Sequence, residues 1–285
     1  MLANQKKIYR NVYLIYTCNK YEYRVKILNN HYKQNVKSPD VYFFVIGNSH
    51  TDYVYDNMIY LNCGDLYENL PHKVVMSFIF CVTNFNFEKI FKIDDDIFIN
   101  FNKIRELNFT ETKYNYFGKQ TPPTSQLVGN RWHINKLSKN NKYNKTVAPN
   151  FMFPFNRTQL FYYPCGGFYI ISKHNCELIF DYYEQNSNFV KNHIYEDILI
   201  YKILSENNIM PTFFDSNMWL SVNLKEIDQN IFEIISDKNK ININIHNYIS
   251  IHCGSLIGNY NVDELLFKKI FEFFMDLTLA SRKII

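Results

Sequence analysis

Short apolar runs alternate with polar, helix-like segments through the first hundred residues of the chain. Three runs have the length and the aromatic or β-branched content of buried strands, and they cover residues 12–17, 41–46 and, more weakly, 58–61. Helices are predicted between them, at residues 21–32 and from Pro71 onward. This order, completed by one further strand, predicts an α/β fold with a mainly parallel central sheet flanked by helices.

The second half of the chain repeats this pattern with longer polar breaks. A strand is predicted at residues 168–172, and helices are predicted at residues 176–183, 197–204 and 262–277. Residues 121–161 are polar and weakly periodic, which is typical of a long loop. The apolar stripe of the last helix fits core packing better than binding to a membrane surface.

An acidic triplet at residues 94–96 interrupts the apolar stretch FKIDDDIFIN. Three adjacent carboxylates repel one another, so their burial at a strand end requires a cation or a network of hydrogen bonds. Mg²⁺ and Mn²⁺ take oxygen ligands from carboxylates and phosphates, and ligands of parallel sheets bind beyond the carboxyl ends of the strands. The triplet is therefore a candidate metal–diphosphate site at a strand end, with a solvated acidic turn as the alternative.

Composition limits the class of protein. The 285 residues are 47% hydrophobic, which is enough for a large core and too apolar for a disordered chain. The net charge of +4, without a dominant run of lysines, gives no support to nucleic-acid binding. The sequence contains neither a run of 18 apolar residues nor a signal-peptide core, which predicts no transmembrane segment and a cytoplasmic location. Six dispersed cysteines without a CxxC pair argue against a zinc knuckle.

Four further segments line up with the acidic triplet. They read DLYENLPHK at 65–73, FYYPCGGFYIIS at 161–172, YEDILIYKIL at 195–204 and IHCGS at 251–255. In this order the segments resemble the β-1,3-galactosyltransferase and Fringe-like glycosyltransferases (glycosyltransferase family 31), which carry D-x-Y-x-N-L-x-x-K, K-x-D-D-D-x-F-x-N, Y-P-x-Y-x-x-G-x-G-Y-x-x-S and E-D-V. The resemblance covers about residues 12–255.

Two features depart from the family pattern. Arg24 is the only arginine between residues 11 and 103, where the family has paired arginines, and the segment after Pro164 is one or two residues shorter than usual. Donor and acceptor specificity are therefore the least transferable properties.

The resemblance implies a GT-A fold in which residues 1–285 form a single domain, with a donor half over about 1–118 and an acceptor half over about 119–285. It implies an inverting glycosyltransferase that moves a hexose or N-acetylhexosamine from a UDP-sugar to a hydroxyl of a glycan or glycoconjugate. The product is a β-linkage, with β-1,3 favoured, and UDP-galactose, UDP-N-acetylglucosamine and UDP-glucose are all open as donors. The family's Golgi anchor has no counterpart here, which predicts a cytosolic member, or a Golgi-luminal protein if this chain is part of a longer one.

Site residues follow from the same resemblance. Asp96 is the implied ligand of Mn²⁺ or Mg²⁺, joined by Asp94 and by a histidine, for which His252 is preferred over His246. Asp94 also faces the ribose or a metal-bound water, and Asp95 orients its neighbours. The positions implied to contact the nucleotide-sugar donor are Asp94, Asp95, Arg24, Lys73, Gly166 and Gly167. An aromatic stretch at 131–163 is expected to shape the acceptor site, where Trp132, Tyr162 and Tyr163 either stack on sugar rings or pack in the core.

Asp197 is the implied general base, and Glu196 is its supporting neighbour. Inverting transfer needs one carboxylate to accept the proton of the acceptor hydroxyl while the hydroxyl oxygen attacks the anomeric carbon. Acids in the first turn of a helix also favour its positive dipole end, so position alone does not separate a catalytic from a structural role.

Two other functions compete with glycosyl transfer. A phosphohydrolase of the haloacid dehalogenase type also places Asp-x-Asp at a strand end, but it usually has Thr or Val at the position that Phe98 occupies here. A non-catalytic carbohydrate-binding protein with the same fold is the second alternative, because a fold does not guarantee activity.

Overall fold

The computed structural model describes most of the predicted sheet and its helices. The described residues are 6–107, 109, 111–121, 161–193, 195–215, 218–223, 248–254, 267–269 and 271–272.

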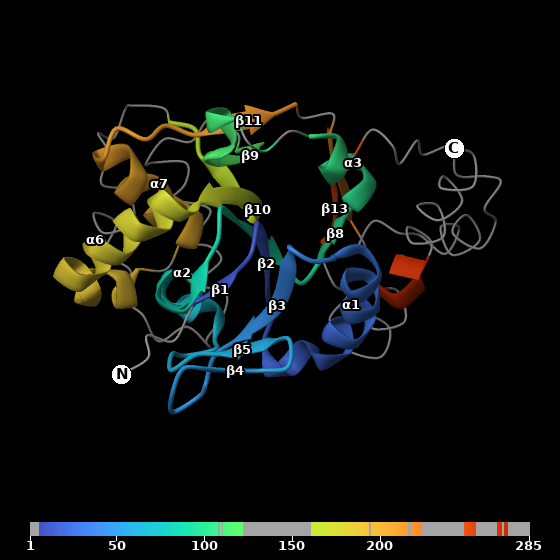
Figure 1. Ribbon diagram of the computed structural model, residues 1–285, viewed down its shortest axis with the longest axis horizontal. Coiled ribbons are helices and arrows are strands. Elements are labelled where there is room, and N and C mark those ends of the chain that lie inside the picture. The colour runs from blue at the N-terminus through green and yellow to red at the C-terminus, as the bar shows by residue number, and fades with distance from the viewer. Residues whose placement is uncertain are drawn as a thin grey trace.

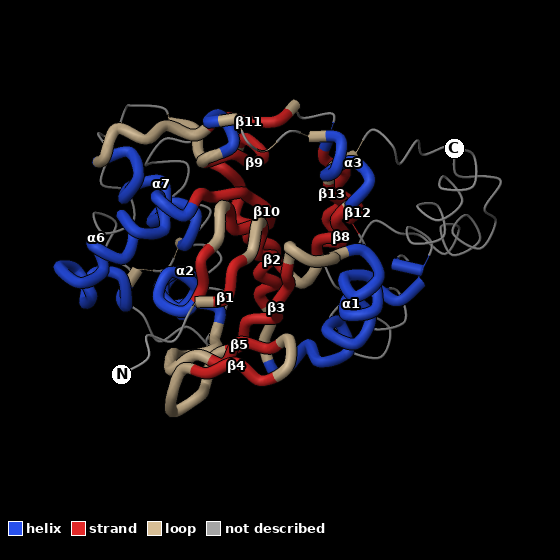
Figure 2. Tube along the Cα trace, viewed as in Figure 1, coloured by secondary structure: helices blue, strands red, loops and turns tan. Residues whose placement is uncertain are grey.

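An eight-stranded sheet forms the centre of the fold (Figures 1 and 2). In spatial order its strands are β11 (Thr212–Phe214), β9 (Tyr116–Gln120), β10 (Pro164–Ser172), β7 (Lys89–Asp94), β2 (Asn11–Tyr16), β3 (Val41–Ile46), β5 (Met58–Tyr60) and β4 (Tyr53–Tyr55). Strands β7, β2, β3 and β5 are parallel, whereas β10 runs antiparallel to both β7 and β9. The carboxyl ends of β2, β3 and β7 therefore lie together, at what we call the carboxyl end of the sheet, and the amino end of β10 joins them there.

Two smaller sheets accompany the main one. Strand β8 (Ile97–Ile99) follows β7 after a two-residue turn and pairs with β13 (Ser250–Gly254), which in turn pairs with β12 (Trp219–Asn223). Strands β1 (Lys7–Ile8) and β6 (Phe85–Asn86) form a separate parallel pair. The polypeptide thus leaves the main sheet at the acidic triplet and enters the three-stranded sheet.

Helices cover both faces of the main sheet (Figure 1). Helix α1 (Glu22–Asn35) lies on one face, and α2 (Leu70–Asn84), α6 (Lys173–Asn192) and α7 (Glu196–Glu206) lie on the other. Helix α3 (Phe101–Glu106) follows β8. Short 3₁₀ turns occupy Asn19–Tyr21, Tyr67–Asn69 and Thr112–Tyr114.

Strand β2 shows why the sheet is covered on both faces. All six of its residues are buried. Val12 and Leu14 pack into the core shared with α2, α6 and α7, whereas Tyr13 and Ile15 pack into the core that contains α1. Successive side chains of a strand point to opposite faces, so a continuous apolar run such as VYLIYT fits a strand with a core on each side.

The sequence predictions for the first half are confirmed, with small shifts of the boundaries. Strand β10 begins at Pro164, earlier than predicted, so the glycine pair Gly166-Gly167 lies inside the strand where its register with β9 shifts. The weak strand predicted at residues 58–61 is β5, but the sequence pattern misses β4 and the hairpin turn that joins the two strands, where Asp56 has a φ of 54°. Residues 122–160 and most of the predicted helix 262–277 lie outside the described residues. No helix among the described residues is long and apolar enough to cross a membrane.

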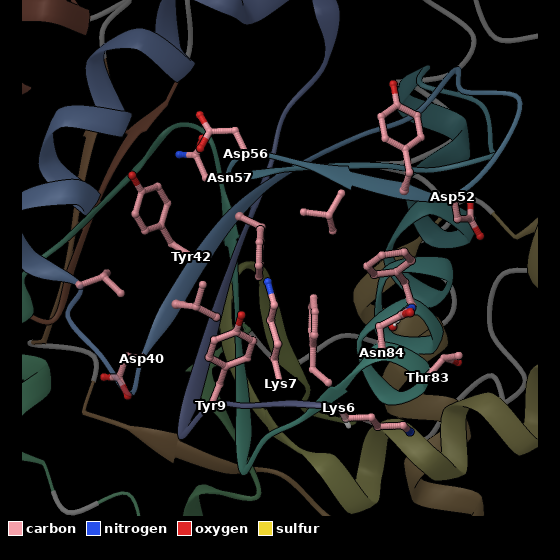
Figure 3. Close-up of a pocket in the computed structure, with 17 residues that line it drawn as sticks. Lys6, Lys7, Tyr9, Asp40, Tyr42, Asp52, Asp56, Asn57, Thr83 and Asn84 are labelled. Atoms are coloured by element: carbon pink, nitrogen blue, oxygen red, sulfur yellow. Dashed lines mark hydrogen bonds between the residues drawn. The ribbon is translucent and has the colours of Figure 1, made fainter. Parts of the chain in front are cut away.

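A cavity of about 800 Å³ lies away from the carboxyl end of the sheet, between β1, the β4–β5 hairpin and the end of α2 (Figure 3). Several of its polar groups already bond to the protein. Asp40 accepts hydrogen bonds from Arg10 at 3.1 Å and from Asn11 at 3.2 Å, and Asp52 accepts one from the backbone N–H of Asn62 at 2.6 Å. None of the predicted site residues lines this cavity, and they gather instead at the carboxyl end of the sheet.

Candidate active site

The acidic triplet forms the turn between β7 and β8. Asp94 ends β7, opposite Tyr16 of β2, and Asp95 and Asp96 make the turn before Ile97. On the other side of β7, Phe168 of the antiparallel strand β10 lies opposite Ile93, which brings the glycine pair next to the turn. The prediction of an acidic triplet at a strand end is confirmed.

Asp95 points into the protein. Its carboxylate forms a buried ion pair with the guanidinium of Arg24 and accepts a hydrogen bond from Thr17 Oγ1 at 2.7 Å. The guanidinium of Arg24 also lies over the ring of Tyr21, 4.1 Å from its centroid. Arg24 and Asp95, both predicted to contact the donor, therefore bind each other. Their buried contact holds the turn at residues 95–96 against the protein core.

Asp96 and His252 lie together at the junction of the two sheets. His252 on β13 is paired with Ile97 on β8, and its Nε2 is 3.7 Å from Asp96 Oδ2. Burial lowers the pKa of His252, but the carboxylates of Asp96 and Asp94 outweigh this effect and raise it overall. Two ligands of one ion at bond lengths of about 2.1 Å can be this far apart. No group of three or more candidate ligands arranged to hold a metal occurs within the described residues, and His246 lies outside them.

Exposure separates the triplet and its neighbours into two groups. The side chains of Asp94, Asp96 and His252 keep 33%, 27% and 34% of their surface exposed. The side chains of Asp95, Arg24, Lys92 and Glu196 are buried. The three residues that the family resemblance implies as metal ligands are therefore among those that reach solvent, as does Asp197.

Lys92 connects the triplet to the two other motifs. Its ammonium group contacts the carboxylate of Asp94 and the carbonyl oxygen of Gly166, and it lies 3.7 Å from Glu196 Oε2. The charges of Asp94 and Glu196 outweigh the opposing effect of burial and raise the pKa of Lys92, so this side chain is cationic at neutral pH. The motif K-x-D-D-D identifies Lys92 only as a motif position, although a lysine two residues before Asp94 on one strand points to the same face and signals such a contact.

Glu196 and Asp197 lie in the first turn of α7, beside the start of β10. Asp197 accepts hydrogen bonds from the backbone N–H of Gly166 at 3.3 Å and of Ile198 at 2.9 Å. Burial raises the pKa of Asp197 and raises that of Glu196 to about 8. A Cβ on Gly166 would lie 2.6 Å from Glu196 Oε2, so a side chain at this position would displace the carboxyl group of Glu196.

Lys73 and Asp65 form a second buried ion pair near the carboxyl ends of β2 and β3. Lys73 Nζ lies 2.8 Å from Asp65 Oδ1 and donates to the carbonyl oxygen of Thr17 at 2.7 Å. Asp65 also accepts a hydrogen bond from the backbone N–H of Gly47 at 2.9 Å. Lys73, predicted to contact the donor, is thus engaged with the protein itself, and Thr17 links this pair to the Arg24–Asp95 pair.

The predicted acceptor region is described only at its end. Tyr162 is exposed, whereas Tyr163 is buried and packs with Phe161 and Tyr201, so Tyr163 has the core-packing role of the two alternatives. Trp132 lies outside the described residues.

The geometry thus places two acidic motifs, linked by one lysine, around the same end of a mainly parallel sheet. Comparison with known proteins places the sequence in a family. The sequence matches the family described as galactosyltransferase over residues 33–212, which is more than half of the chain. The chain therefore belongs to the galactosyltransferase family, in agreement with the resemblance found in its motifs.

Solved structures similar to this chain include several glycosyltransferases. One is the bifunctional glycosyltransferase WbbM in its apo form (10% identity, TM-score 0.45, 94% of this chain and 50% of that chain). The present chain thus spans half the length of that protein. Another is a glycosyltransferase involved in glycosylation of the major capsid of PBCV-1 (10% identity, TM-score 0.46, 91% of this chain and 98% of that chain). A third is the galactosyltransferase LgtC in complex with donor and acceptor sugar analogs (9% identity, TM-score 0.46, 92% of this chain and 95% of that chain). A search of curated protein sequences gave no match.

Proposed function

We propose that the protein is a metal-dependent, inverting glycosyltransferase of the GT-A type. It transfers a hexose or N-acetylhexosamine from a UDP-sugar to a hydroxyl of a glycan or glycoconjugate and forms a β-linkage, with β-1,3 favoured. Family membership supports glycosyl transfer. The observation that carries the finer proposal is the meeting of the acidic turn and the Glu196-Asp197 pair across Gly166.

An excess of negative charge supports the binding of a cation. Five carboxyl groups gather here, namely those of Asp94, Asp95, Asp96, Glu196 and Asp197, whereas Lys92 and Arg24 are the permanent cations that contact them. His252 contributes a further charge only when it is protonated. Such an imbalance in a largely buried site is costly unless protons or a bound cation offset it.

Asp96, His252 and Asp94 are the residues that would hold Mn²⁺ or Mg²⁺. Their carboxylate and imidazole donors suit Mn²⁺, and the two carboxylates suit Mg²⁺. Both ions take up phosphate oxygens as well, and the partial exposure of the three side chains leaves room for a diphosphate. When bound, the ion supplies positive charge that neutralises the departing UDP.

The two acids of α7 take different roles in this proposal. With a pKa of about 8, Glu196 keeps its proton at neutral pH. Two backbone N–H groups donate to Asp197 and favour its ionised form against the effect of burial. Asp197 is therefore the carboxylate that accepts the proton of the acceptor hydroxyl, and neutral Glu196 avoids a second charge beside it.

Binding and transfer assays on Asp197→Asn test this proposal. Calorimetric titration with UDP, in Mn²⁺ and then in chelator, is followed by transfer assays with UDP-galactose, UDP-N-acetylglucosamine and UDP-glucose. The wild type is expected to bind UDP only with the metal and to consume one donor preferentially. Asp197→Asn is expected to bind UDP as the wild type does but to transfer sugar at least about 10²-fold more slowly.

The control variant for this experiment is Asp181→Asn, which neutralises an exposed carboxylate on α6 and is expected to leave binding and transfer unchanged. Unchanged transfer by Asp197→Asn would refute the base assignment. UDP binding without any transfer by the wild type would favour the non-catalytic carbohydrate-binding alternative instead.

A further inference from the structure

Lys92 is the most completely buried charged side chain at the candidate site. It lies on β7, and none of its surface is exposed. Lysine is almost never fully buried without partners, because removing the ammonium group from water is costly. Lys92 finds its partners in Asp94, the carbonyl oxygen of Gly166 and Glu196, and its ammonium lies 5.2 Å from the ring centroid of Tyr16.

Gly166 stands between this lysine and the proposed base. Its carbonyl oxygen accepts a hydrogen bond from Lys92, and its backbone N–H donates to Asp197 Oδ2 at 3.3 Å. A Cβ on the same glycine would lie only 2.6 Å from Glu196 Oε2, so the carboxyl group of Glu196 packs directly against it. A displacement of the ammonium group would therefore move Gly166 and, through its N–H, the hydrogen bond to Asp197.

From these contacts we infer that Lys92 is a positioning residue. It holds Asp94 and Gly166 with one ammonium group and so fixes the base Asp197 relative to the acidic turn. The side chain of Lys92 has no exposed surface, so we infer that it acts through Asp94 and Gly166 rather than by contact with the substrate. The inference rests on the proposed function insofar as Asp197 is the base.

Lys89 provides a matched control on the same strand. It is buried as well, but its Nζ donates to Asn115 Oδ1 at 3.2 Å, and no carboxylate of the site contacts it. Replacing either lysine by methionine removes one buried ammonium group from β7 and keeps an unbranched side chain. Only the change at Lys92 removes the link between the two acidic motifs.

Kinetics of Lys92→Met and Lys89→Met test the inference. Lys92→Met is expected to lower kcat for sugar transfer by about 10–100-fold, because a small displacement of a catalytic group has effects of this size. KM for the UDP-sugar is expected to change less than kcat, because Asp96 and His252 keep their places and only Asp94 loses a partner. Lys89→Met is expected to keep kcat within about twofold of the wild type. Wild-type kcat in Lys92→Met, or equal kcat losses in both variants, would overturn the inference.

Lys92→Arg serves if the methionine variant does not fold. The guanidinium group keeps the charge but has a planar geometry that cannot reproduce the contacts of an ammonium group. The kcat of Lys92→Arg is expected to lie below those of the wild type and of Lys89→Met. An arginine variant with full wild-type kcat and an unmoved Gly166 would also contradict the inference.

A second measurement does not depend on activity. The chain has eight glycines, so glycine-selective ¹⁵N labelling gives a simple amide spectrum. In the Lys92 variants the Gly166 amide signal is expected to shift and to exchange its proton faster, and in Lys89→Met it is expected to stay in place. If the wild type transfers no sugar, the proposed function fails while this measurement still tests the link. If the wild type is active and the Gly166 signal does not move, the positioning inference alone fails.

Discussion

Two groups of charged side chains lie at the carboxyl end of the sheet, and they differ in the ratio of cations to anions. Lys73 and Asp65 form a pair of one cation and one anion, which backbone groups of Thr17 and Gly47 complete. The acidic cluster, which we define as Asp94, Asp95, Asp96, Glu196 and Asp197, has Lys92 and Arg24 as its only permanent cations among the described residues.

This difference separates a structural from a functional use of charge. A balanced pair with complete hydrogen bonds is stable without any ligand. Removing one partner leaves the other charge buried without compensation, which is costly. An unbalanced cluster is costly in the free protein and becomes favourable when a cation or a proton joins it. We therefore expect substitutions in the Lys73–Asp65 pair to affect folding and substitutions in the acidic cluster to affect binding and transfer.

The largest expected effect on folding comes from Lys73→Met. Removing one partner leaves the Asp65 carboxylate buried without its cation, so the free energy of unfolding is expected to fall by about 3–5 kcal/mol. The double variant Lys73→Met/Asp65→Leu removes both charges and is expected to be more stable than the single variant. Urea unfolding of the three proteins measures both differences. A double variant less stable than the single one would show that Asp65 acts mainly through Gly47 rather than through the lysine.

A smaller effect, dependent on pH, is expected for Glu196. Its pKa of about 8 in the folded protein lies above the ordinary value of 4.5, so the folded state holds a proton that the unfolded state loses as pH rises between these values. Stability of the wild type is therefore expected to fall by roughly 2–4 kcal/mol between pH 4.5 and 8 through this group, and to change little through it above pH 8.

Glu196→Gln removes the titrating proton and provides the comparison. Unfolding of wild type and variant, measured in chelator from pH 5 to pH 8, is expected to show the variant gaining stability relative to the wild type as pH rises. Parallel stability profiles for the two proteins would mean that Glu196 is ionised in the folded state.

The sequence predicts the sheet better than it predicts the site. Strands β2 and β3 are continuous apolar runs with helices on both sides, and such runs have few alternatives. By contrast, strand β4 is a triplet of exposed residues, and the turn that joins it to β5 depends on a positive φ at Asp56 that composition alone does not specify. The three-stranded sheet joins β8 to strands more than a hundred residues later, and local periodicity carries no information about such pairing.

The candidate site shows the same limit at the level of single residues. Motif resemblance identifies Asp96, His252, Gly166 and Asp197 as one set, and the fold brings their segments together. Resemblance does not show that Asp95 turns inward to Arg24, or that Lys73 is occupied by Asp65. These pairings join side chains of helices α1 and α2 to acids that follow the strands, so they depend on how the helices pack against the carboxyl end of the sheet. The roles of all these residues in donor binding, metal binding and catalysis stay predictions.

Ligands are expected to stabilise the fold through the acidic cluster. If the acidic cluster binds the metal–UDP complex, adding Mn²⁺ and UDP at about 100 times the dissociation constant is expected to stabilise the wild type by about 2.7 kcal/mol. Asp96→Asn is expected to lose this gain, whereas Asp181→Asn on α6 is expected to keep it. Thermal unfolding with and without the ligands measures the difference. A full gain in Asp96→Asn would remove Asp96 from the proposed ligand set.

The smallest expected effect distinguishes the two neighbouring glycines. A Cβ on Gly166 would lie 2.6 Å from the buried Glu196 Oε2, whereas a Cβ on Gly167 would meet Ile97 Cδ1 at 3.3 Å and the Trp219 ring at 3.4 Å. Gly166→Ala is therefore expected to destabilise the fold by about 1–3 kcal/mol, and Gly167→Ala by less, because an aliphatic side chain adjusts by a few tenths of an ångström more easily than a buried carboxyl group beside Lys92. Urea unfolding of the two variants ranks their stabilities directly.

Two double variants test the cause of the difference. Because the contact at Gly166 is with the carboxyl group of Glu196, Gly166→Ala combined with Glu196→Ala is expected to regain part of the lost stability. Gly167→Ala combined with Glu196→Ala is expected to regain none. Equal behaviour of the two double variants would mean that the glycine pair serves the strand and its register shift rather than the approach of Glu196 to Lys92.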